Sequence, residues 1–98
     1  MTNFSDMLSK AKAMQEKMKE VQNQIKKIEV EGMSGGNLVK VILTGDYEIK
    51  SIDISESAKK ESQEIINDLI IAAYNNAKEN LKKKSAEELS KVTGGLNL

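Results

Sequence analysis

Apolar residues recur in alternating steps of three and four along the first 28 positions of the chain. They are Phe4, Met7, Ala11, Met14, Met18, Val21, Ile25 and Ile28. This heptad seam predicts a helix over about residues 5–27, with Ser5 or Asn3 as its N-cap. A stripe of this kind can pack on the core of its own domain. Because the seam is narrow, it also favours a partner helix, from this chain or from a second copy.

The period changes to two after Ile28, which predicts β-strands over about residues 28–33, 38–44 and 47–54. In "YEIKSIDI" the alternation reverses between Ile49 and Ile52, so we expect a bulge near Ser51. The segment "TGDY" predicts a tight hairpin between the second and third strands, with Gly45 supplying a positive φ. Three strands form only a small sheet, which predicts that a second subunit completes or covers it.

A second long helix is predicted over about residues 60–92, beginning between Lys59 and Gln63. Its first half, "IINDLIIAAYNNA", is apolar almost all round and is expected to be buried on more than one side. Beyond Ala77 apolar residues become sparse, so the second half should project into solvent, with Gly94 as the C′ residue. The sequence therefore predicts an α+β fold, an α-β-β-β-α protomer forming a single domain over residues 1–98.

Composition narrows the chemistry that such a domain can perform. The chain has no cysteine and no histidine, so thiolate chemistry, disulfides and the usual acid/base and metal ligand are missing. It has no apolar run of membrane-spanning length and no signal-peptide h-region at its start, from which we expect a cytoplasmic protein. Its 15 acidic and 15 basic residues cancel, but residues 1–27 carry net +3, residues 28–68 net −5 and residues 69–98 net +2.

Residues 32–36, "GMSGG", match the G-x-S-x-G pattern of a hydrolase nucleophile elbow. That motif needs a strand before the serine, a helix after it and a neighbouring base, whereas this segment lies between two predicted strands. A phosphate-binding loop needs a following Gly-Lys-Ser/Thr, which is also missing. We interpret Ser34 to Asn37 as an exposed hairpin loop and expect no catalytic residue, no metal and no cofactor. The acidic pairs on the strands are interpreted as solvated outward faces.

The lysines carry the functional hypothesis. On the first helix Lys10 and Lys17 occupy g positions beside the seam, while Lys12, Lys19 and Lys26 share the b position. The second helix adds Lys78, Lys82, Lys83 and Lys84. Lysines of this kind are often only the solvated face of a helix, and Lys10 has Asp6 available as an i, i+4 partner. In a dimer, however, every stripe is doubled and paired basic helices could lie against DNA phosphates. Every basic residue is lysine, so little sequence-specific base readout is expected.

Three blocks, "MLSKAKAMQEKMKEVQNQI", "VEGMSGGNLVKVILTGDYEIKSIDI" and "NDLIIAAYNNA", resemble in order and spacing the YbaB/EbfC family of bacterial nucleoid-associated proteins. The resemblance covers roughly residues 7–96. It implies a tweezers-like homodimer whose helices project from a shared core and bind DNA in the cytoplasm, at the nucleoid. The family's proposed DNA-contacting parts correspond here to residues around Lys10 to Lys19 and Lys78 to Lys91.

The sequence thus predicts a non-catalytic, homodimeric nucleoid-associated protein that binds duplex DNA mainly through phosphate contacts and affects chromosome organisation and gene expression. Its expected partners are DNA and a second copy, with no membrane and no small-molecule substrate. The predicted DNA-binding residues are Lys10, Lys12, Lys17, Lys19, Lys78, Lys82, Lys83, Lys84 and Lys91. The alternative is a non-catalytic coiled-coil scaffold or chaperone-like interaction protein, which would require heptads in both helices.

Overall fold

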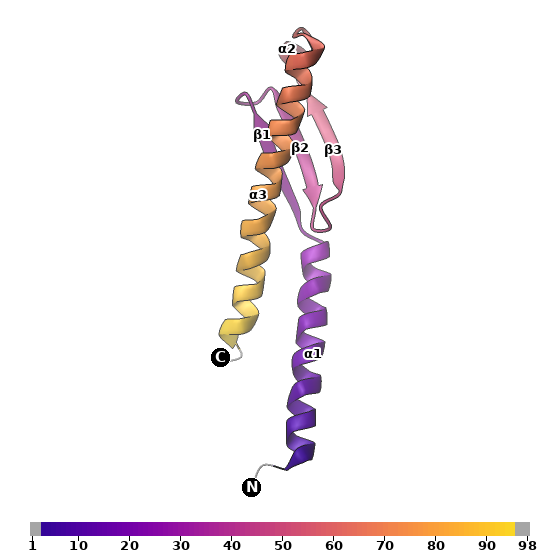
Figure 1. Cartoon of the computed structure of the whole chain (residues 1–98), viewed down its shortest axis with the longest axis vertical. Coiled ribbons are helices and arrows are strands. Elements are labelled where there is room, and N and C mark those ends of the chain that lie inside the picture. The colour runs from indigo at the N-terminus through magenta and orange to yellow at the C-terminus, as the bar shows by residue number, and fades with distance from the viewer. Residues whose placement is uncertain (1–2, 96–98) are drawn as a thin grey trace.

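The computed structural model describes residues 3–95, and the side chains of residues 3–91. Along the chain the elements are α1 (Phe4–Lys26), β1 (Glu29–Ser34), β2 (Val39–Thr44), β3 (Ile49–Ile54), α2 (Glu56–Lys59) and α3 (Gln63–Gly95) (Figure 1). This order confirms the predicted α+β fold with helices at both ends. The short helix α2 was not predicted. Ser55 caps it, because its hydroxyl accepts a hydrogen bond from the Ala58 amide at 3.1 Å.

The three strands form one antiparallel sheet in the order β1-β2-β3. Ile42 pairs with Ser51 but Leu43 pairs with Ile49, so Lys50 is the extra residue of a β-bulge. This confirms the bulge predicted near Ser51, one residue earlier. Because the bulge resets the alternation, Ile49 lies on the same face of the sheet as Ile52 and Ile54.

Helix α3 lies across one face of the sheet, over β1 and β2 (Figure 1). The core between them consists of Val39, Val41, Leu43, Ala58, Ala73, Ala77 and Leu81, all fully buried. The helix approaches β1 so closely that a Cβ at Gly32 would overlap the Ala73 carbonyl oxygen and the Ala77 backbone. Small residues on both elements therefore permit this packing, and large side chains of β2 fill the space beside it.

Helix α1 projects from this core instead of packing on it, and its Val21 is the only buried residue. The molecule measures 72 × 19 × 16 Å as a result. We call residues 21–81 the base, and residues 4–20 of α1 with residues 82–91 of α3 the arms. Asn3 caps α1 by accepting a hydrogen bond from the Asp6 amide at 2.9 Å, which makes it the N-cap of the two residues predicted.

Two predictions about glycines were wrong in detail. Gly45 does not have a positive φ; Tyr47 does, at 63°. Gly45 is needed for a different reason, because a Cβ there would overlap the Ile25 carbonyl at the end of α1. Gly94 is not a C′ residue, since α3 continues through Gly95.

Ser34 was also placed wrongly, because it ends β1 and is buried, not exposed in a loop. Its hydroxyl donates to the Leu69 carbonyl of α3 at 2.6 Å. The turn itself consists of residues 35–38, where Gly35 and Gly36 have positive φ values of 57° and 74°. The motif "GMSGG" therefore connects two strands, and its serine attaches the first of them to α3.

Candidate nucleic-acid interface

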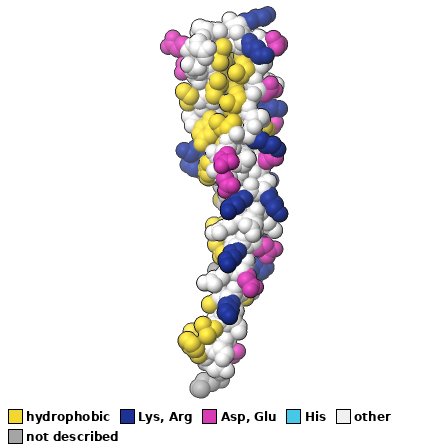
Figure 2. Space-filling model, turned by 90° about the vertical axis from the view of Figure 1, so that its right-hand side faces the viewer, with side chains coloured by type: hydrophobic (Ala, Val, Ile, Leu, Met, Phe, Trp, Pro, Cys, Tyr) yellow, Lys and Arg dark blue, Asp and Glu magenta, His cyan; other side chains and the backbone are white. Residues whose placement is uncertain are grey.

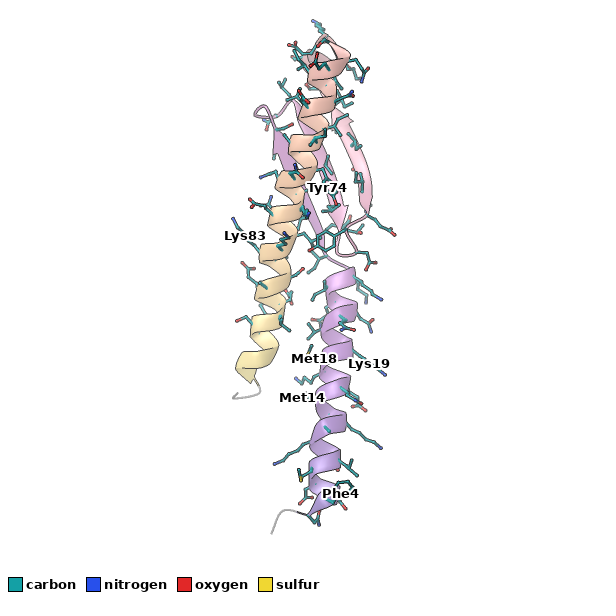
Figure 3. All side chains as sticks on the ribbon, viewed as in Figure 1. Phe4, Met14, Met18, Lys19, Tyr74 and Lys83 are labelled. Atoms are coloured by element: carbon teal, nitrogen blue, oxygen red, sulfur yellow. The ribbon has the colours of Figure 1, made fainter. Side chains whose placement is uncertain are left out.

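The most regular basic surface of the protein lies along α1. Lys12, Lys19 and Lys26 are spaced by seven residues, so each is rotated only about 20° from the one before, and all three are exposed. Lys19 points away from α3, whereas Met14 and Met18 point toward it (Figure 3). The apolar seam and the basic stripe therefore lie on different sides of α1. We call Lys12, Lys19 and Lys26 the α1 stripe.

None of the α1 stripe residues forms an ion pair with any part of the chain that the structure describes. Lys10 and Lys17, beside the seam, are likewise exposed, and the i, i+4 pair considered for Lys10 and Asp6 is not formed. Because these ammonium groups have no carboxylate partner, they can neutralise an external anion without first breaking an internal contact. Lys26 belongs to this surface although the predicted DNA-binding set omitted it. The heptad that placed Lys12 and Lys19 was a sufficient signal to include it.

The lysines predicted on the second helix do not form a comparable stripe. Lys82, Lys83 and Lys84 are consecutive, so their side chains leave α3 about 100° apart and spread around the helix. In Figure 3 Lys83 lies on the side of α3 remote from α1. Lys78 is half-buried, and Lys91 pairs with Glu88 at 3.3 Å. Among the predicted DNA-binding residues, Lys12 and Lys19 thus lie on one side of α1, whereas the lysines of α3 leave that helix in several directions.

Lysines near the sheet differ from those on α1, because they have carboxylate partners. Lys40 pairs with Glu31 at 3.2 Å and Lys50 pairs with Glu29, both across the sheet face opposite α3. Glu29 and Glu31, two of the carboxylates interpreted as solvated strand faces, therefore lie on the outward face and also form cross-strand ion pairs. A hollow of about 320 Å³ on the same face is lined by Glu31, Met33, Asn37, Lys40, Asp53 and Ser55. This face carries mixed charge and offers no basic surface.

We also searched the described part of the chain for a membrane-spanning helix, a metal site and an exposed serine nucleophile. Residues 3–95 contain no helix long and apolar enough to cross a bilayer. They also contain no cluster of three acidic residues placed to hold a metal ion. Ser34, the residue of the hydrolase-like motif, is buried and has its hydroxyl bonded to a backbone carbonyl.

Comparison with a solved structure relates the fold to a known protein. A crystal structure of an uncharacterized protein from Helicobacter pylori matches with a TM-score of 0.75 at 17% identity, covering 94% of this chain and 98% of that one. At this identity the likeness concerns the fold alone.

Comparison of sequences identifies the family. Nucleoid-associated proteins of Afipia carboxidovorans and Agrobacterium fabrum are 38% and 42% identical to this chain, covering all of it and 94% and 92% of the relatives. The model of the YbaB/EbfC DNA-binding family matches residues 1–96. The chain therefore belongs to the YbaB/EbfC DNA-binding family.

Proposed function

We propose that this protein binds duplex DNA as a homodimer, mainly through contacts between lysines of α1 and distal α3 and the phosphate backbone. The observation that carries the proposal is the α1 stripe, a row of exposed lysines without internal partners on a helix that projects from the base. Family membership supports DNA as the ligand, and the names of the relatives support a location at the nucleoid.

The spacing of the stripe suits a regular polyanion. Neighbouring lysines of the stripe are about 10 Å apart along α1, which equals about three base-pair steps of 3.4 Å. Lysine contacts phosphate as a point charge, and the chain has no arginine for bidentate guanine contacts. The binding mode is therefore dominated by the backbone and weakly selective for sequence. Binding of this kind would affect chromosome organisation and, through it, gene expression.

Uncovered apolar side chains support the homodimer. On β3, Ile49 is 46% exposed and Ile52 is 44% exposed. Figure 2, which faces the side where β3 lies, shows hydrophobic side chains gathered over the upper half of the molecule. A contiguous apolar surface on a small protein typically marks an interface. A second copy would bury this surface and double the basic arms.

The experiment is a fluorescence anisotropy titration of labelled duplex DNA across a series of salt concentrations. The test variant changes Lys12, Lys19 and Lys26 to Gln. Its matched control changes Lys40, Lys50 and Lys59 to Gln, which removes the same charge from lysines already paired with carboxylates. We expect the slope of log affinity against log salt to fall by about 0.9 for each lost phosphate contact in the test variant, and to stay near the native value in the control.

Equal weakening of both variants would show that only net charge matters and would refute the stripe as the contact surface. A native protein that remains a dimer but binds no DNA would favour the scaffold alternative. Light scattering over a range of concentrations tests the dimer separately from the DNA titration. A monomer at all concentrations would refute the homodimer.

A further inference from the structure

One large apolar side chain of α1 does not belong to the heptad seam. Leu8 directly follows the seam residue Met7, so the two side chains leave the helix about 100° apart. Leu8 is 49% exposed. Figure 1 shows this end of α1 extending well beyond the end of α3 in the described chain, so α3 does not cover it. Packing within the protomer therefore does not account for Leu8.

Leu8 lies in line with the α1 stripe. Lys26 follows it by 18 residues, which is about five helical turns, so both side chains leave α1 in the same direction. Lys19 and Lys12 deviate from that direction by only about 20° and 40°. Phe4, at the border of the seam, deviates by about 40° to the other side and is 75% exposed, the highest value among the large hydrophobic residues described. The basic stripe thus continues into two exposed apolar side chains, Phe4 and Leu8, which we call the tip pair.

The other side chains along this line are uncharged. Gln15 and Gln22 lie between the lysines and are exposed. Glu16 is the acidic residue of α1 nearest in direction to Leu8, and its side chain leaves the helix about 80° away. This side of α1 is therefore positively charged over most of its length and apolar at the tip.

The length of the line determines what the tip pair would meet on DNA. Phe4 and Lys26 are 22 residues apart, or about 33 Å along α1, which is close to the roughly 34 Å of one duplex turn. A phosphate strand winds once around the duplex over that distance, so a straight helix cannot remain above the same strand. One end of the line must lie over a groove. The apolar end is the one that has no charge to place on a phosphate.

We propose that Phe4 and Leu8 enter the minor groove as an apolar wedge at a base-pair step, while the α1 stripe contacts the neighbouring phosphates. This inference rests on the DNA binding of the proposed function and adds a contact with bases. Phenylalanine and leucine are among the side chains that DNA-bending proteins insert between base pairs, and insertion kinks the duplex by about 20–90°. Pyrimidine–purine steps unstack most easily. The wedge therefore selects flexible sequences and needs no hydrogen bonds to base edges.

Two other occupants fit the tip pair less well. A second copy joined symmetrically through this face would bring the lysines of two stripes together, and like charges across an interface are unfavourable. A membrane surface would attract the lysines, but an amphipathic helix binds a membrane through an apolar face along its length. Beyond Leu8 this line consists of lysines and glutamines.

Alanine variants separate the wedge from the charge contacts. The test variant carries Phe4→Ala with Leu8→Ala. The matched control carries Met14→Ala with Met18→Ala, which removes two apolar side chains, 42% and 37% exposed, that point toward α3 (Figure 3). Neither variant changes a charge, so both should keep the native slope of log affinity against log salt. We expect the test variant to bind duplex DNA about 10-fold more weakly at every salt concentration, and the control to bind within about twofold of native.

The fluorescence of aminopurine, an adenine analogue that brightens when it unstacks, reports the wedge directly. The analogue replaces the adenine of a TA step in one duplex and an adenine of an A-tract in another. Native protein and control should raise the fluorescence, and more at the TA step, because A-tracts are stiff. The test variant should not raise it. An equal rise with the native protein and the test variant would overturn the inference.

The same samples distinguish this inference from the proposed function. If the native protein binds DNA and the test variant binds and unstacks it equally well, the wedge fails and the proposed function is upheld. If the test variant loses unstacking but the Gln variant of the α1 stripe keeps the native salt slope, the wedge is upheld and the phosphate contacts of the stripe fail. A native protein that binds no DNA would refute both.

Two controls without DNA test the other occupants of the tip pair. Sedimentation velocity compares the oligomeric state of the test variant with that of the native protein, and cosedimentation with vesicles of anionic phospholipid measures membrane binding. We expect native sedimentation and no vesicle binding that depends on Phe4 and Leu8. Dissociation of the test variant would assign the tip pair to a contact between copies, and loss of vesicle binding would assign it to a membrane. Either result would overturn the wedge.

Discussion

The base and the arms of this protein are stabilised in different ways. Every buried residue of the described chain lies between positions 21 and 81, and every side chain from residue 3 to residue 20 is exposed. The radius of gyration is 19.7 Å, whereas a compact chain of this length would have roughly 13 Å. The arms therefore depend on helix propensity and capping, and the base depends on burial. Folding stability and DNA affinity should accordingly respond to different substitutions.

A leucine-to-alanine substitution in each region should give the largest difference in the free energy of unfolding. Leu43→Ala removes a fully buried side chain from the core and should lower the free energy of unfolding by about 2–5 kcal/mol. Leu8→Ala removes a side chain that is 49% exposed on α1 and should change it by less than about 0.5 kcal/mol. Urea denaturation followed by circular dichroism measures both. A similar loss in the two variants would show that the arm is packed in solution.

Gly45→Ala acts at the junction between the base and the α1 arm. The added methyl group would overlap the Ile25 carbonyl, so the hairpin or the last turn of α1 must shift, at a cost of about 1–3 kcal/mol. The shift is magnified at the far end of the helix. Denaturation measures the cost, and dipolar distances between spin labels on an introduced cysteine pair measure the direction of α1. An unchanged distance with native stability would contradict the close approach.

Ser34→Ala affects the attachment of β1 to α3 within the base. Loss of the hydroxyl that donates to the Leu69 carbonyl should lower the free energy of unfolding by about 1 kcal/mol. This is more than expected for an exposed loop serine. Ser9→Ala, on the exposed surface of α1, is the matched control and should leave stability unchanged or slightly higher, because alanine favours helix. Equal effects in both variants would argue against the buried hydrogen bond.

Asn3→Ala should have the smallest effect on global stability. It removes the side chain that accepts from the Asp6 amide, and a lost N-cap costs the helix about 1 kcal/mol. Because the first turns of α1 touch nothing in the base, the cost should appear as local fraying and not as global unfolding. Amide hydrogen exchange should become faster for residues 5–10 and remain native in the sheet. Faster exchange throughout the base would indicate that the arm and the base unfold together.

Local signals predicted the elements well where each residue's own neighbours decide its conformation. The heptad seam predicted α1. The alternation along residues 39–44 predicted β2, in which Val39, Val41 and Leu43 all point into the core. Gly45 was assigned correctly to the turn but for the wrong reason, and Ser34 was assigned to an exposed loop although it ends β1 and is buried. The close approach of Gly45 to Ile25 and the bond from Ser34 to Leu69 join segments distant in the sequence. No periodicity along the chain encodes such contacts.

The sequence by itself determined the types and order of the two long helices and three strands, and the basic character of the projecting helices, because hydrophobic period and charge spacing are local properties. Only the tertiary structure decided that α3 covers the outer edge of β1. There the Met33 amide donates to Asn76 and Asn80 donates to the Glu31 carbonyl, across 43 and 49 positions of the sequence. The tertiary structure also decided that the side of α1 carrying Lys12, Lys19 and Lys26 faces away from α3 (Figure 3). Packing between segments that are distant in the sequence determines which side chains are in contact, and local sequence patterns do not contain that information.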